Sequence, residues 1–303
     1  MKRHRKSGFF LKLFIVLLIL GGIITGAYFA IDKLVVPKYF SSYGIHNMNE
    51  LVGMMKTLYN SPDEKSFITN AYTKIDETNA VKKLGEANFP KTSTGAIDYG
   101  AVADGEIAVK KGKYHFTDRE IGAILNEMAE SGVLASKLPN LKYLNDMSMN
   151  VMEFIVSPAV VSEGDKFAYS SNKADISCTF KIDTSLVRAQ MAKEMDTPTF
   201  LLNMIIPKNM YIKVDYTIAL DSAGKWVIEH EDMGINGRTA KQSEILINLL
   251  VGFVFPEEAE MTRSKLTEIC GKVLIDGIEL LGDLSFEYNI DSSGTNGVII
   301  TIK

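Results

Sequence analysis

The chain has few of the residues that most often build catalytic and metal centres. It contains two cysteines, four histidines and one tryptophan among 303 residues. The cysteine spacing matches no metal motif, and no pair of histidines has the spacing of a helical zinc site. The sequence contains neither a G-x-S-x-G nucleophile motif nor a glycine loop that would bind phosphate. We therefore expect no metal and no cofactor, and we assign no catalytic residue from the sequence.

Acidic residues are absent from the beginning of the chain. All 37 Asp and Glu follow residue 31, and the stretch from Leu13 to Ile31 has no charge at all. A bilayer core of about 30 Å needs roughly 20 helical residues. The sequence therefore predicts a transmembrane helix over residues 9–31. Five basic residues lie at or before residue 12, which predicts a cytoplasmic tail over residues 1–8 and an extracytoplasmic C-terminal part.

Two further interpretations of this apolar segment are a cleaved signal peptide and a membrane helix that dimerises. A cleaved signal peptide would use Thr25-Gly26-Ala27 as its site, but its apolar region normally has only about 7–15 residues. Gly22 and Gly26 form a G-x-x-x-G pair, which lets two membrane helices approach closely. A homodimer through Gly22 and Gly26 is therefore a candidate, although glycine is common in membrane helices in any case.

Basic residues are too few in the outer part of the chain to attract nucleic acid. It has 28 of the 33 Lys and Arg against all 37 Asp and Glu, which gives a net charge of −9. This charge repels phosphate backbones, so we expect no nucleic-acid partner. Cys178 falls on the apolar face of a predicted strand and Cys270 on a predicted helix. We expect two buried free thiols, with a disulfide between them as the alternative outside the cytoplasm.

The part nearest the membrane is predicted to be helical. Apolar residues at helical spacing indicate one helix over 48–59, and a cap at Ser61-Pro62 indicates a second that continues to Leu84. Together they would form a helical hairpin. Residues 85–95 read as a linker, so the predicted segments are a membrane-proximal helical segment over 32–90 and an extracytoplasmic domain over 91–303.

The predicted domain combines strands and helices. Thr117 and Glu120 form a capping box, which predicts a helix that begins there. Period-two alternation predicts antiparallel strands, and one strand carries His230 on its apolar face by parity, as a core histidine. These strands span 212–220, 226–230, 284–290 and 298–302. Helices over 184–195, 239–252 and 257–281 would cover them. The fold class is α+β, with an N-terminal transmembrane helix, then a helical hairpin and a curved antiparallel sheet packed on helices.

Two apolar runs, over 200–206 and 245–255, are too short to span a membrane. One interpretation is that they are buried helices of the core. The other is that they line an apolar groove for a lipid or a partner helix. The candidate groove residues are Leu201, Met204, Ile205, Leu249, Phe253 and Phe255.

Three features are similar to YpmS-type membrane-anchored proteins of Gram-positive bacteria. They are the N-terminal anchor, the motif F-T-D-R-E-I-G-A-I-L-N at residues 116–126, and the passage I-I-P-K-N-M-Y-I-K-V at residues 205–214. The resemblance covers about a third of the chain, and the helical segment before residue 90 makes this chain longer than the family's usual form. It implies a location and a general shape, because the family has no established activity.

These observations favour a single-pass membrane protein of the bacterial envelope with an extracytoplasmic domain that binds or scaffolds. Its partners would be the bilayer, through residues 9–31, and a lipid or other apolar ligand, an envelope polymer or another membrane protein. Two alternatives remain. One is an envelope hydrolase that uses carboxylates from distant segments, and the other is a structural component of a membrane complex.

Overall fold

The computed structural model describes residues 28–41, 45–59, 64–103, 109–136, 148–163, 166–194, 203, 207–239, 243, 247, 263–287 and 297–302. The chain divides into two compact units, residues 1–56 and residues 57–303, so the predicted segment 32–90 spans both. The predicted membrane helix 9–31 lies outside the described residues except for residues 28–31. No helix in the described ranges is both long and apolar enough to cross a bilayer.

The first unit contains two helical stretches. A π turn, η1 (Ile31–Val35), leads into α2 (Val36–Phe40), and α3 (Met48–Tyr59) confirms the predicted helix over 48–59. Asn47 caps α3, because its Oδ1 accepts the Glu50 N–H at 3.0 Å. The Asp32 carboxylate accepts the Met48 N–H at 2.6 Å and so joins the beginning of α3 to the first helical stretch.

The second helix of the predicted hairpin is not continuous. Two helices occupy this region, α4 (Glu64–Phe67) and α5 (Lys74–Glu86), and residues 68–73 between them are not helical. The buried carboxylate of Glu153 accepts the N–H groups of Thr69, at 2.7 Å, and of Asn70. These two N–H groups donate to Glu153, far along the chain, and not to the carbonyls of a helix. The helical spacing of apolar residues therefore predicted a continuous helix where the chain has a break. Thr73 then begins α5 with a capping box.

The predicted capping box at Thr117 is confirmed. After α6 (Tyr99–Ala103) and β1 (Gly112–Thr117), the Thr117 hydroxyl accepts the Glu120 N–H, and the Glu120 carboxylate accepts the Thr117 N–H at 2.8 Å. This begins α7 (Asp118–Glu130), which α8 (Val133–Ser136) follows. Glu120 is buried and also binds the Lys83 ammonium at 2.6 Å, so the same carboxylate caps α7 and joins α5 to it.

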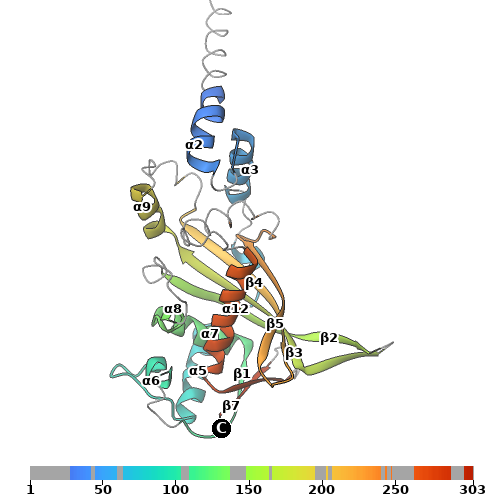
Figure 1. Ribbon diagram of the computed structural model, residues 1–303. Helices are drawn as coiled ribbons and strands as arrows, with labels where there is room; N and C mark the ends of the chain where they lie inside the picture. Colours follow the sequence, from blue (N-terminus) through green and yellow to red (C-terminus); the bar gives the residue numbers. More distant parts are fainter. Residues whose placement is uncertain are drawn as a thin grey trace, which may run out of the picture. The chain divides into compact units, whose positions relative to one another are not determined.

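A four-stranded antiparallel sheet in the order β2-β3-β4-β5 forms the centre of the second unit (Figure 1). Its strands are β2 (Met149–Glu163), β3 (Lys166–Asp183), β4 (Asn209–Leu220) and β5 (Trp226–Ile235). Helix α9 (Ser185–Glu194) lies between β3 and β4 in sequence. The far end of the β2–β3 hairpin, beyond the last residue paired with β4, projects as a two-stranded ribbon (Figure 1).

One face of this sheet packs on helices. Helix α7 lies against β2, and α12 (Arg263–Glu279) lies mainly against β5. The approach of α12 is close at Gly271, where an added Cβ would come within 2.5 Å of Ile228 and 2.7 Å of Tyr216. A side chain at this position would push the helix away from the sheet. Alternate residues of the four strands, such as Phe154, Cys178 and Val214, are buried beneath the helices.

The last two strands belong to a second sheet rather than to the same one. Strands β6 (Asp283–Glu287) and β7 (Gly297–Ile302) join β1 in the order β1-β7-β6. Trp226 links the two sheets: its indole N–H donates to the Leu284 carbonyl at 3.2 Å, and its ring contacts Phe286 edge-on. The fold is therefore a mixture of helix and antiparallel sheet, as expected, with the strands divided between two sheets.

Both cysteines are free thiols, as predicted. Cys178 is fully buried on β3, and Cys270 on α12 is partly exposed. Burial raises the pKa of both thiols, to about 12 for Cys270. Both thiols are therefore almost entirely protonated at pH 8, and the thiolate is the reactive form.

Glu153→Ala should reduce the free energy of unfolding by about 2–4 kcal/mol, because two backbone N–H groups lose a charged acceptor. Urea unfolding of the detergent-solubilised chain, followed by Trp226 fluorescence, measures this loss. Glu153→Gln is the matched control and should cost about 1 kcal/mol, since its amide oxygen can still accept. An alanine variant no less stable than the glutamine variant would contradict this role of the carboxylate.

Ellman's reagent at pH 8 should react with neither thiol of the native chain within minutes. After unfolding in guanidinium, two thiols per chain should react, because both raised pKa values return toward that of an exposed cysteine. A chain that shows no thiol even when unfolded would instead contain the disulfide.

Candidate functional site

The apolar groove residues predicted from the sequence, Leu201, Met204, Ile205, Leu249, Phe253 and Phe255, lie outside the described residues, as do Gly22 and Gly26. The groove and the dimer face therefore stay predictions. The described part of the chain brings together a different set of side chains, on the face of the four-stranded sheet that is opposite to α7 and α12.

Strand register places these side chains in two adjacent rows. Each row crosses all four strands, because the residues of a row are directly paired from one strand to the next. The first row is Ile155, Ser177, Asp215 and Asp232, and the second is Ser157, Asp175, Thr217 and His230. Members of the two rows are two residues apart on each strand, so both rows belong to the same face.

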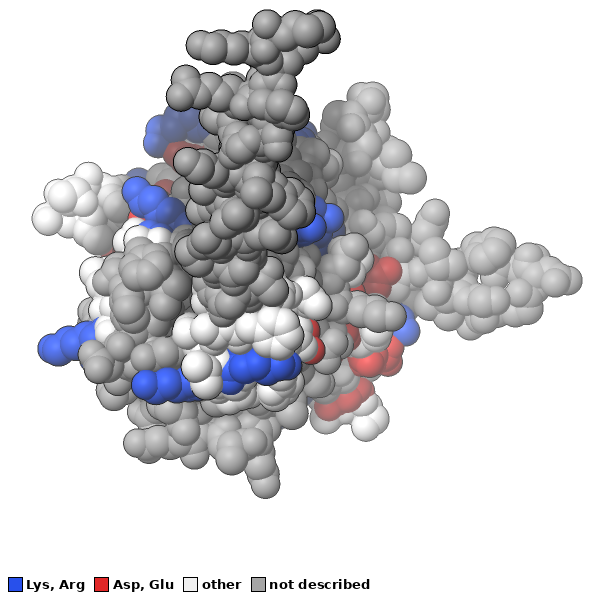
Figure 2. Space-filling view, turned by 90° about the horizontal axis from the view of Figure 1, so that it is seen from above, with Lys and Arg blue, Asp and Glu red and all other residues white. Residues whose placement is uncertain are grey.

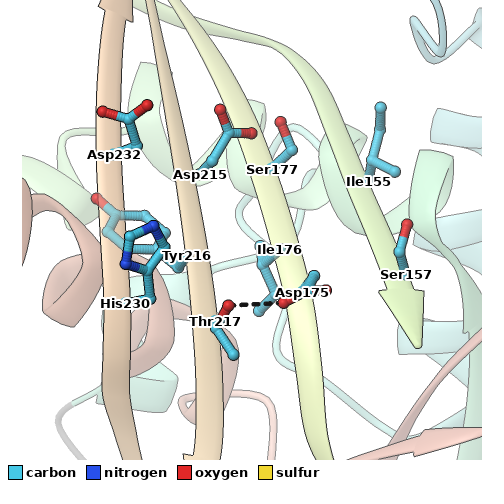
Figure 3. A pocket seen from close by; sticks show the side chains of 10 residues that line it. All are labelled: Ile155, Ser157, Asp175, Ile176, Ser177, Asp215, Tyr216, Thr217, His230 and Asp232. Carbon is cyan, nitrogen blue, oxygen red and sulfur yellow. Dashed lines mark hydrogen bonds between the residues drawn. The ribbon is translucent and has the colours of Figure 1, made fainter. Parts of the chain in front are cut away.

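The two rows line a groove of about 520 Å³ (Figure 3). The carboxylates of Asp215 and Asp232 lie next to each other and point the same way, with the Ser177 hydroxyl beside Asp215 (Figure 3). Asp175 supplies a third carboxylate from the second row. Within the described residues, neither Lys nor Arg lines the groove. The groove is therefore acidic and rich in hydroxyl groups.

Several of these groups already have partners. The Thr217 hydroxyl donates to the Asp175 carboxylate at 2.7 Å. Lys213, one row further along β4, lies 3.4 Å from the Asp215 carboxylate and forms a partly exposed ion pair with it. Such a pair contributes little, because both groups remain solvated. The Ser177 Oγ is buried and has no hydrogen-bond partner among the described residues.

Asp215 on β4 is paired directly with Asp232 on β5. This pairing of two carboxylates is unfavourable for the stability of the sheet. Like charges that face each other across two strands lower stability. A binding surface often retains groups that reduce stability, because function and stability compete for the same positions. The pair therefore marks this face as a candidate site.

His230 lies on the open face, so the parity argument that placed it in the core was wrong. Thr217 pairs with His230 while the next residue, Ile218, pairs with Ile228. Glu229 is therefore an extra residue, a β-bulge, and a bulge reverses the alternation of side chains beyond it. Ile228 packs beneath α12, whereas His230 is exposed.

The groove does not have the form of a metal centre. No group of three or more His, Cys, Asp and Glu side chains in the described ranges is arranged to hold a metal ion. What the carboxylates and hydroxyls can do is accept hydrogen bonds and ion pairs from ammonium or guanidinium groups. Figure 2 shows that charge is unevenly distributed over the described surface, with Asp and Glu gathered on one side of the view.

The sequence indicates some residues of this groove, but not that they lie together. Alternation over the predicted strand 212–220 places Asp215 on a polar face, whereas the predicted strand 226–230 ends before Asp232. Asp175, on β3, had no local signal. Only the register of three strands brings these residues together, and the bulge at Glu229 sets that register for β5.

No model of a protein family matches the chain, and a search of curated proteins finds no match either. The resemblance to YpmS-type proteins therefore stays an expectation from the sequence.

Asp232→Asn should raise the free energy of unfolding by about 0.3–1 kcal/mol, because it removes the repulsion between facing carboxylates. Urea unfolding at low ionic strength measures the gain. In 1 M NaCl, where the screening length is about 3 Å, the gain should mostly vanish. Asp175→Asn is the control: it faces Thr217 rather than a carboxylate, and it should give no gain. Equal stabilisation by both variants would show that net charge, and not the facing pair, is responsible.

Proposed function

We propose that the protein is a single-pass membrane-anchored binding protein of the bacterial envelope. In this proposal residues 9–31 hold it in the membrane, and the groove on the open face of the β2–β5 sheet binds a cationic group of an envelope component or of another membrane protein. The observation that carries the binding role is the convergence of Asp175, Asp215 and Asp232, without a lining Lys or Arg in the described part of the chain.

The form of the groove favours binding over catalysis. It lies on an open sheet face, where water has access to each carboxylate, and catalytic sites usually exclude water. The hydroxyl groups of Ser157, Ser177 and Thr217 add hydrogen-bonding capacity around the three charges. An ammonium or guanidinium group can interact with more than one of these oxygens at once. A net charge of −9 outside residues 1–31 also favours a basic partner.

A second candidate is the envelope hydrolase. The observation that favours it is the same facing pair, which brings two carboxylates from different strands side by side in the groove (Figure 3). Retaining glycosidases use a pair of carboxyl groups about 5–5.5 Å apart. Release of reducing ends from purified cell-wall glycan, abolished in Asp232→Asn, would establish the hydrolase. Equal release by the variant would exclude this pair as its catalytic residues.

Oligolysine is a suitable probe for the binding role. The full chain in uncharged detergent should bind it in a salt-dependent way, and Asp215→Asn/Asp232→Asn should weaken binding by about three- to tenfold. That range corresponds to two partly exposed ion pairs at about 0.3–0.7 kcal/mol each.

The matched control is Glu86→Gln/Glu268→Gln, which makes the same change in net charge at two exposed residues of α5 and α12. Its affinity for oligolysine should change by less than about twofold, because only the overall field differs. Equal weakening by the two double variants would overturn the groove as the binding site.

A further inference from the structure

The described helical stretch from residue 28 onward has an inverted pattern of exposure. Four large apolar side chains are exposed: Tyr28 by 41%, Phe29 by 60%, Ile31 by 38% and Leu34 by 68%. Between them, the Asp32 side chain is only 13% exposed. A water-soluble helix normally has the opposite arrangement, with its apolar side chains covered and its carboxylates in solvent.

The polar groups of this stretch are taken up by the neighbouring helix. Asp32 accepts the Met48 N–H at the N-terminus of α3, where a helix favours negative charge. The Tyr28 hydroxyl donates to the Asn49 side chain at 3.0 Å. Helix α3 thus satisfies the polar groups of the stretch and leaves Phe29 and Leu34 facing outward without cover in the described part of the chain.

We infer that residues 28–34 are seated in the outer headgroup layer of the bilayer, so that the membrane-contacting surface continues past residue 31. This inference rests on the proposed anchoring through residues 9–31. The segment before this stretch, residues 9–27, would span about 28 Å at 1.5 Å per residue, close to the roughly 30 Å of a hydrocarbon core. The exposed apolar side chains follow this segment directly, so lipid is the partner that we infer to cover them.

The dimensions and residue types agree with this position. The headgroup layer is about 5–7 Å thick on each side, and the rise from Phe29 to Leu34 is about 7.5 Å. Aromatic residues are enriched at this depth, as at Tyr28 and Phe29. The Lys33 ammonium lies 3.1 Å from the Asp32 carboxylate, and the side chain is 67% exposed, so this ammonium is placed at the level expected for lipid phosphates.

The experiment places single tryptophans along the stretch in the full chain, reconstituted in nanodiscs that contain brominated phosphatidylcholine. The variants are Phe29→Trp, Leu34→Trp and Ser41→Trp, and the wild-type signal of Trp226 is subtracted. Quenching by bromine should be at least twofold stronger at positions 29 and 34 than at position 41, which lies about 10 Å further along. Acrylamide, a quencher in water, should give the reverse order.

Three other results would overturn the inference. If bromine quenches a tryptophan at position 34 as weakly as one at position 41, while position 29 is quenched strongly, Leu34 lies in water. If the tryptophan at position 34 is shielded from both bromine and acrylamide, a protein, such as a second copy of this chain, covers it. Equal bromine quenching at all three positions would mean that the stretch lies flat on the surface. Membranes washed with sodium carbonate separate this question from anchoring: if the chain is removed by the wash, the anchor itself fails.

Discussion

The carboxylate of Glu153 is the interaction on which the arrangement of the second unit depends. It is buried on β2 and accepts the backbone N–H groups of Thr69 and Asn70. Asn70 in turn donates to Asp118 at 2.8 Å and accepts from Arg119, both at the beginning of α7. One buried charge therefore holds the segment before α5, the edge of the sheet and the helix that covers it. Leaving such a charge or its donors without partners is costly, which makes the arrangement specific.

The sheet held in this way has two different faces. One face packs on α7 and α12 and supplies apolar side chains to the core. The other bears the acidic groove and remains open to solvent. This division would separate the requirements of packing from those of the proposed binding. Residues such as Asp215 and Asp232 can repel each other at a modest cost, because water and Lys213 screen them and because no core contact depends on them.

Features determined by neighbouring residues could be predicted from the sequence. The capping box at Thr117 uses residues three positions apart, and α3 follows from apolar spacing over 12 residues. Features determined across the chain could not. The helix break at residues 68–73 depends on Glu153, which is 84 residues from Thr69, and the groove depends on the register of three strands. Periodicity carries no information about such distant partners, because it describes one element at a time.

The bulge at Glu229 has a consequence for how β5 tolerates substitution. Before it, even-numbered residues such as Ile228 face the core, and after it odd-numbered residues such as Met233 do. Even-numbered residues of β5 therefore face the core before the bulge and the open face after it. A substitution profile along β5 should therefore change phase at residue 229. Removal of that single residue would turn Trp226 and Ile228 outward or His230 and Asp232 inward, and would erase the groove without altering any residue that lines it.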